Sequence, residues 1–334
     1  MTDTALRDSS GSKRRGLKLD MRALSPFIAL IVLIIAGTLV NPDFLTTSNL
    51  LNVVTRSAFI AIIAVGATFV IAGGGLDLSV GSMAALVAGM TILTLNSIGT
   101  PEVSTLALGL LVALGLGAAC GLANGLIVTF GRIEPFIVTL GTMGIFRSLV
   151  IFLAAGGTIT MRNLELRELY RPIYFGNLFG VPIPIIVFMA VAAVGALILY
   201  KTPFGRHVVA IGSNEDVARY SGVPIGRVRT LTYVIQGICV GIAVLVYVPR
   251  LGSATPTTGL LWELQAITAV VIGGTALRGG IGRIWGTVVG AVILELVANI
   301  MVLSNFVSEF LVGAVQGAII IVAMLVQRSL HRGR

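Results

Sequence analysis

Few residues in this sequence could carry out catalysis, and their spacing is not that of an enzyme. The chain holds two histidines, His207 and His331, and two cysteines, Cys120 and Cys239, which lie inside apolar runs without CxxC spacing. Zinc sites and histidine-based triads need ligands or nucleophile–base pairs that this set does not supply. The Lys of a phosphate-binding loop follows none of the glycine-rich segments, so we expect no ATP hydrolysis by the chain itself. The sequence predicts a protein that is not an enzyme and needs no metal or cofactor.

Polar groups inside apolar runs are the second kind of candidate. In a membrane such groups are costly, so they usually face the interior of a helix bundle or a water-filled cavity. The candidates for lining a pathway are Thr68, Asn124, Thr139, Thr142, Arg147, Gln236, Glu295 and Asn299. Because neutral amides and hydroxyls outnumber charges, the set suits an uncharged, polyhydroxylated solute better than an ion. The alternative is that these groups bond neighbouring helices, and Arg147 and Glu295, the two well-buried charges, could pair.

The composition indicates that these groups lie in a lipid bilayer. Of 334 residues, 56% are hydrophobic and 11% are charged, whereas about 25% charged is usual for a soluble domain. The net charge of +9 comes from short basic clusters between apolar runs, without the interleaved aromatic residues of a nucleic-acid-binding face. The apolar runs are continuous rather than alternating, which favours transmembrane helices over transmembrane strands.

The apolar runs predict an all-α polytopic membrane protein with about ten transmembrane helices. About 20 residues cross the hydrocarbon core, and runs of that kind lie near residues 25–41, 50–72, 79–98, 105–129, 134–155, 181–200, 230–248, 264–277, 285–303 and 306–327. The first run is not followed by the small residues of a signal cleavage site, so we expect it to be retained. Most Lys and Arg residues fall in alternate connections, which places both termini in the cytoplasm.

This topology divides the chain into a cytoplasmic tail at 1–24, a membrane permease domain at 25–328 and a second cytoplasmic tail at 329–334. Two connections are long: a periplasmic loop at 156–180 and a cytoplasmic loop at 201–229.

A glycine-rich segment separates the second apolar run from the third. Its motif residues are Gly74, Gly75, Asp77, Ser79 and Gly81. One interpretation is a helix end, with Asp77 and Ser79 capping the next helix. The other is a broken helix against protein or a water-filled cavity. Residues 70–81 resemble residues 271–282, which suggests a parallel internal repeat.

The loop at 201–229 contains a short predicted amphipathic helix. Asn214 is a suitable N-cap, Glu215 follows in the first turn, and Gly222 could end the helix. The segment is either a solvated connector or a docking element for a cytoplasmic partner. Elsewhere, Gly117, Gly121 and Gly125 repeat at four-residue spacing and predict close helix packing, within the bundle or between subunits.

Four motifs in order, at 74–81, 134–142, 205–222 and 271–282, resemble the ribose/simple-sugar permease family of ATP-binding-cassette importers. The resemblance covers residues 40–326, with Leu76 where the family commonly has Ile. It implies a permease in the bacterial cytoplasmic (inner) membrane that works as a pair, and it implies further that the pair is a homodimer.

The resemblance also implies two other partners. One is a periplasmic or lipid-anchored substrate-binding protein, and the other is a separate cytoplasmic ATP-binding-cassette ATPase. By position, the residues that couple to the ATPase are Gly205, Arg206, Gly212, Asn214, Glu215, Ala218 and Gly222. The competing hypotheses are a stand-alone secondary transporter or channel for a small neutral solute and, third, a membrane enzyme.

Overall fold

The computed structural model describes residues 21–304 together with residues 311, 313–315, 317, 318 and 321. The helices are α1 Met21–Val40, η1 Pro42–Leu45, α2 Thr47–Ala72, α3 Val80–Ile98, α4 Val103–Gly131, α5 Pro135–Leu153, α6 Leu164–Tyr170, α7 Pro172–Phe175, α8 Ile183–Lys201, α9 Pro203–Ser213, α10 Glu215–Tyr220, α11 Ile225–Leu251, α12 Trp262–Ile272 and α13 Ile284–Ser304. The strands are β1 Ile159–Thr160, β2 Asn177–Leu178, β3 Val181–Pro182 and β4 Ser253–Ala254.

Helices dominate the described part of the chain, as the sequence predicts. Seven of them are long and apolar enough to cross a membrane: α2, α3, α4, α5, α8, α11 and α13. The apolar part of α1, Leu24–Val40, and the whole of α12 are shorter. The predicted run at 264–277 is therefore cut short at Ile272, where glycines follow. Most of the predicted run at 306–327, and the tails at 1–20 and 329–334, lie outside the described residues.

α2 is the central helix of the bundle. It packs against α8, α11, α12 and α13, and every residue from Ile60 to Ala72 is buried. A helix that is apolar on all sides suits either a protein core or lipid, and here the neighbouring helices enclose this half of α2. The polar groups on the elements around α2 are therefore held against a rigid apolar core.

Glycines bring α4 and α11 into close contact inside one subunit. A Cβ at Gly117 would lie 2.3 Å from the Gly237 carbonyl oxygen, and a Cβ at Gly121 would lie 2.1 Å from the Tyr233 carbonyl oxygen. Such distances leave no room for a side chain, so the backbones themselves are in contact. The first of the two predicted uses of these glycines, packing within the bundle, is confirmed for this helix pair.

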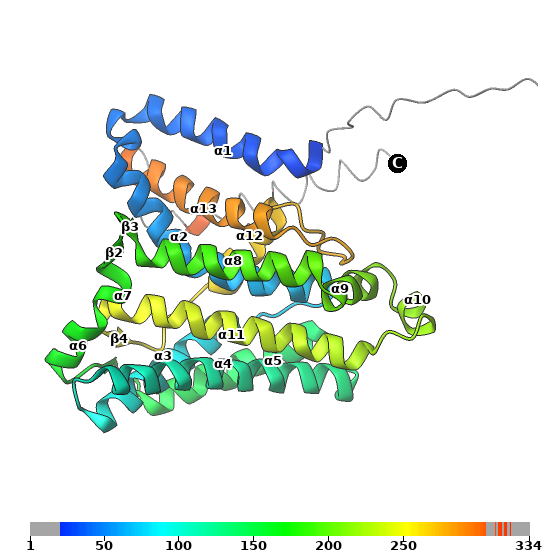
Figure 1. Ribbon diagram of the computed structural model, residues 1–334, viewed down its shortest axis with the longest axis horizontal. Helices are drawn as coiled ribbons and strands as arrows, with labels where there is room; N and C mark the ends of the chain where they lie inside the picture. Colours follow the sequence, from blue (N-terminus) through cyan, green and yellow to red (C-terminus); the bar gives the residue numbers. More distant parts are fainter. Residues whose placement is uncertain (1–20, 305–310, 312, 316, 319–320, 322–334) are drawn as a thin grey trace, which may run out of the picture.

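The two ends of the bundle carry different short elements. β1 pairs with β4 and β2 pairs with β3, both antiparallel, and these strands lie with α6 and α7 at one end, which we call the α6 end (Figure 1). α9 and α10 project at the opposite end, the α10 end (Figure 1). α11 begins at Ile225, so the connection predicted to run to residue 229 is shorter than expected.

The internal repeat is present in the backbone. Three backbone hydrogen bonds end α2, in which the N–H groups of Gly73, Gly74 and Gly75 donate to the carbonyls of Phe69, Ile71 and Val70, respectively. The same pattern ends α12, where the N–H groups of Gly273, Gly274 and Thr275 donate to the carbonyls of Ala269, Val271 and Val270. Gly74 and Gly274 both adopt left-handed φ angles, 82° and 81°. The structure therefore matches Gly74 with Gly274. The alignment of residues 70–81 with residues 271–282 is off by one residue, because it matches Gly73 with Gly274.

Candidate functional site

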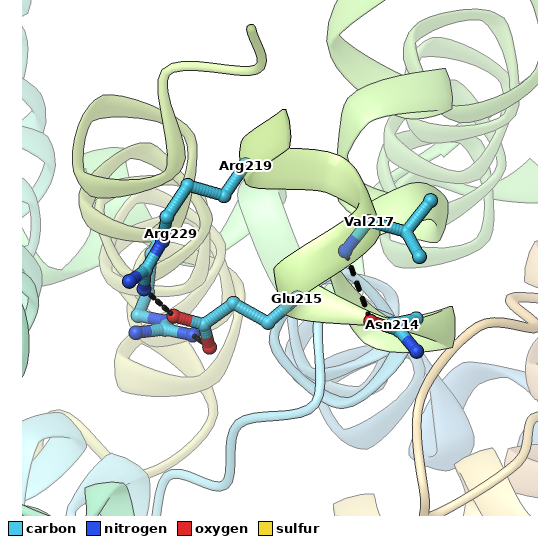
Figure 2. Close-up of polar contacts among 5 residues, drawn as sticks. All are labelled: Asn214, Glu215, Val217, Arg219 and Arg229. Carbon is cyan, nitrogen blue, oxygen red and sulfur yellow. Dashed lines mark hydrogen bonds and ion pairs between the residues drawn. The ribbon is translucent and has the colours of Figure 1, made fainter. Parts of the chain in front are cut away.

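The α10 end carries a small helical hairpin made of α9 and α10. The Thr202 hydroxyl accepts a hydrogen bond from the Gly205 N–H at 3.2 Å and starts α9. Asn214 separates the two helices, and its Oδ1 accepts from the Val217 N–H at 3.0 Å, as Figure 2 shows. The predicted N-cap at Asn214 is confirmed. Gly222, with φ at 78°, ends α10 as predicted.

Glu215 ties the hairpin to the base of α11. Its carboxylate accepts hydrogen bonds from Arg229 on α11 and, at 2.9 Å, from Arg219 on α10 (Figure 2). The hydrogen bond from Arg229 is the main cause of a pKa of Glu215 below its usual value. Glu215 is thus a tether as well as a first-turn acid that complements the helix dipole.

Three small residues seat the hairpin on the bundle. A Cβ at Gly205 would lie 2.0 Å from the Leu199 carbonyl oxygen, and a Cβ at Gly212 would lie 1.9 Å from the Ala72 carbonyl oxygen. Ala218 is buried in an apolar cluster with Val208. Any side chain longer than these would force the backbones apart.

Gly212 touches both halves of the internal repeat. The carbonyl oxygen of Ala72, the last residue of α2, accepts a hydrogen bond from the Gly280 N–H at 2.9 Å. Gly212 lies against this pair, since its Cβ would also meet the Gly280 nitrogen at 2.5 Å. Gly279 faces it as well, with a φ of 86° and its own Cβ position 2.7 Å from the Gly212 carbonyl oxygen. The hairpin is therefore fixed to the ends of α2 and of the loop after α12.

The outer surface of the hairpin is different in character. Tyr220 is 91% exposed and Val217 is 60% exposed, and Arg206 is also exposed. Of the seven residues predicted to couple to a partner, Arg206 and Asn214 are exposed and Glu215 is partly exposed, while the glycines and Ala218 shape and seat the hairpin. The sequence reasoning missed Val217 and Tyr220, although two apolar residues on a short charged helix are a visible signal.

The glycine-rich motif forms a break between α2 and α3. After Gly75 the chain runs without helical structure to Ser79, and the Tyr233 hydroxyl donates to the Leu76 carbonyl oxygen at 3.2 Å. Asp77 Oδ1 accepts from the Ser79 N–H at 2.9 Å and from the Ser79 hydroxyl at 2.7 Å. The Ser79 side chain makes no capping bond to α3, so the expected cap by Ser79 is wrong; the hydroxyl is used by Asp77 instead.

Helix α4 and the segment before α12 hold the break from two sides. Asn124 on α4 donates through Nδ2 to the Ser79 hydroxyl at 2.8 Å. A Cβ at Gly81 would lie 2.1 Å from the Gly259 carbonyl oxygen. The oxygens Asp77 Oδ2 and Asn124 Oδ1 are buried without a hydrogen-bond partner among the described residues.

Several pathway candidates make hydrogen bonds between or within helices. The Thr68 hydroxyl bonds that of Thr287 at 2.9 Å, and Gln236 donates to the Ile63 carbonyl oxygen at 3.3 Å. The remaining bonds are those of Asn299 with Asn49, of Thr139 with the Pro135 carbonyl and of Thr142 with the Thr139 carbonyl. In this conformation the predicted alternative, bonding to a neighbouring helix, accounts for Thr68, Gln236 and Asn299. Thr139 and Thr142 bond carbonyls of their own helix, α5.

The two charged candidates lie apart. Arg147 on α5 donates from one guanidinium nitrogen to the carbonyl oxygens of Pro256 and, at 2.8 Å, Thr258. Glu295 on α13 lines a cavity with Arg250. The suggested pairing of Arg147 with Glu295 is therefore wrong in this structure, because backbone carbonyls take the guanidinium.

Two cavities share Arg250. One, of about 400 Å³, lies toward the α6 end and is lined by residues that include Asn52, Arg56 and Tyr174. The other, of about 260 Å³, is lined by Ser57, Phe59, Ile60, Tyr247, Arg250, Trp262, Gln265, Ala291, Leu294 and Glu295. Aromatic rings beside charged and amide groups suit a small polar organic molecule. The sequence reasoning missed Arg250 and Trp262, which stand at helix ends.

Comparisons with known proteins agree over nearly the whole chain. A family model described as "Branched-chain amino acid transport system / permease component" matches residues 49–324. The ribose import permease protein of Bacillus subtilis (strain 168) is 40% identical over 313 residues, which cover 92% of this chain and 94% of that protein. The ribose import permease protein of Haemophilus influenzae is 38% identical over 304 residues, 91% and 92% of the two chains. The L-arabinose transport system permease protein of Escherichia coli (strain K12) is 35% identical over 303 residues, 91% and 89%.

Proposed function

Since this chain belongs to the branched-chain amino acid transport system permease family and, within it, resembles the permeases of sugar importers, we propose that it is the membrane subunit of an ATP-driven importer. The predicted resemblance to simple-sugar permeases is confirmed, and with it a multi-pass membrane location. The partners, the solute and the mechanism that follow are part of the proposal.

The proposed solute is a monosaccharide or a related polyol. Relatives are named for import of ribose and for transport of allose and arabinose. The groups available inside this subunit agree with a neutral, hydroxylated molecule, because hydroxyls, amides and aromatic rings outnumber charges among them. A binding protein in the periplasm, or anchored to lipid, would deliver the solute at the α6 end.

The single observation that carries the proposal is the seating of the α9–α10 hairpin. Val217 and Tyr220 present apolar surface outward, while Gly212 fixes the hairpin to Ala72 and Gly280 inside the bundle. We infer that a separate ATP-binding-cassette ATPase docks on this outer surface. The α10 end then faces the cytoplasm, as its basic residues favour.

The proposed mechanism is alternating access. Closure of the ATPase would move the hairpin, and the backbone contacts at Gly212 would pass that movement to α2 and to the loop after α12. Energy enters only through differential contacts of the ATPase with the two conformations. A second copy of this chain would complete the passage in the bacterial cytoplasmic membrane.

The docking surface is tested by changing its outward side chains while leaving its attachments intact. The double variant Val217→Glu, Tyr220→Ala should lose at least about tenfold in co-purification of the cognate ATPase, equivalent to about 1.4 kcal/mol. Phe179→Ala is the matched control, because Phe179 is 96% exposed at the opposite end. Full retention of the ATPase by the double variant would contradict the docking role.

A further inference from the structure

α12 begins halfway through the bundle. It has 11 residues and rises about 16 Å, which is about half of the ~30 Å hydrocarbon core. Its last residue precedes the glycine loop that reaches Ala72 at the α10 end. Its first residue, Trp262, shares a cavity with Glu295, which lies near the middle of α13. The chain before Trp262 therefore enters the bundle from the α6 end as far as half depth.

The segment before α12, residues 255–261, has no helix or strand of its own. It folds as tight turns, with Thr258 bonded to Thr255 and Leu260 bonded to Thr257 through the backbone. Leu261 has a φ of 66°, a left-handed conformation that is unusual outside glycine. We call residues 255–261 the re-entrant segment.

Irregular backbone at membrane depth is tolerated only where protein buries it or water reaches it, because lipid cannot satisfy its polar groups. Thr257 is exposed, and Leu260 is 61% exposed. The described part of this subunit therefore leaves one side of the re-entrant segment uncovered. The Thr257 hydroxyl on that side is unsuited to lipid, and an aqueous passage satisfies it.

The re-entrant segment also presents the groups that a hydroxylated solute needs. The Thr255 hydroxyl is 2.9 Å from the Thr257 hydroxyl and 3.2 Å from the Thr258 hydroxyl. Arg147 from α5 holds the carbonyl oxygens of Pro256 and Thr258. Thr258 is buried, and its hydroxyl accepts a hydrogen bond from the Thr255 N–H at 3.0 Å, which braces the turn. The hydroxyls of Thr255 and Thr257 can therefore exchange hydrogen bonds with a neutral polyol.

We propose that the re-entrant segment lines the aqueous passage of this subunit and that the hydroxyls of Thr255 and Thr257 contact the passing polyol. Arg147 is then a positioning residue that keeps the turn in place. Only the nature of the solute rests on the proposed function; contact of the segment with water does not.

The test is thiol accessibility at half depth. Thr257→Cys is made in the full chain, in membranes opened to both sides, and treated with a membrane-impermeant, positively charged methanethiosulfonate. The native Cys120 and Cys239 are buried, which keeps the background low. Val194→Cys is the control, because Val194 lies near the middle of α8 and is 58% exposed, on an apolar helix face. Leu260→Cys serves as a second reporter if Thr257→Cys does not fold.

We expect Thr257→Cys to react at least about tenfold faster than Val194→Cys, with a rate that saturating ribose lowers. We also expect the modified protein to lose uptake when it is reconstituted into closed proteoliposomes with its ATPase and binding protein. Reaction as slow as that of Val194→Cys would overturn the proposal, and so would full uptake by the modified protein. If the proposed function is wrong and this inference is right, Thr257→Cys will react, and uptake will not need an ATPase. Failure of this inference would leave ATP-driven uptake intact and the cysteine unreactive.

Discussion

At the residue scale, the side chains that shape this protein act mainly on backbone groups. Arg147 binds two carbonyl oxygens of the re-entrant segment, Tyr233 binds the carbonyl of Leu76, and Asn214 caps α10. Polar groups of irregular backbone have to be satisfied inside a membrane protein. Glu215 is different, because it joins two helices through charge.

The Glu215 tether makes the order of α10 depend on pH. The pKa of Glu215 is lowered in the folded protein, mainly by its hydrogen bond with Arg229. A lowered pKa means that the tether contributes stability above the ordinary pKa of a Glu side chain and loses it as pH falls through the lowered value. The protection of the amides across 215–223, which is the exchange rate corrected for the slower intrinsic exchange in acid, should therefore fall on acidification below pH ~4.5.

The control for this prediction is a pair of substitutions in the same helical turn. Glu215→Gln should exchange faster at neutral pH, by an amount equal to about 0.5–1 kcal/mol for a partly exposed pair, and should lose the acid dependence. Asp216→Asn should keep that dependence, because it leaves the bond to Arg229 in place. An identical acid response of both variants would contradict the role of Glu215.

At the element scale, glycines decide which helices can touch. α4 meets α11 at Gly117 and Gly121, α13 meets the end of α12 at Gly286, and the α9–α10 hairpin meets both halves of the repeat at Gly212. These contacts join backbone to backbone, so a movement of one element displaces its neighbour directly. The hairpin is thus coupled to α2 and to the loop after α12.

Gly212→Ala tests this coupling. The added Cβ would lie 1.9 Å from the Ala72 carbonyl oxygen, so the hairpin has to shift, at a cost of about 1–3 kcal/mol. We expect a lower Tm in detergent and ATP hydrolysis that no longer drives uptake. Gly115→Ala is the control, since nothing lies within 4 Å of its Cβ position. If ATP hydrolysis still drives uptake at the wild-type level in Gly212→Ala, the contact does not couple the hairpin to α2.

At the scale of the whole molecule, the sequence predicts the helices well and their irregular joints poorly. The long runs of α2, α4 and α11 are continuous in the sequence, and the bonds of Asn214 and Gly222 follow local rules. The half-length of α12 is not evident, because Ala276 and Leu277 continue its apolar run beyond the glycines.

Contacts between distant segments could not be predicted from spacing. Arg147 bonds carbonyls more than a hundred positions away, and nothing local marks that choice. One signal for the re-entrant segment was present, since residues 252–261 hold threonines and a proline between two apolar runs but no charge. An uncharged polar connection of this kind suits membrane depth better than a solvated loop.

The most direct test of the central claim is uptake of labelled ribose by proteoliposomes. This chain is reconstituted alone, and together with its cognate ATPase and binding protein. The account predicts accumulation only in the complete system and only with ATP, and a loss of that accumulation in the Val217→Glu, Tyr220→Ala variant. Accumulation by the chain alone, driven by an ion gradient or by the sugar gradient itself, would contradict it.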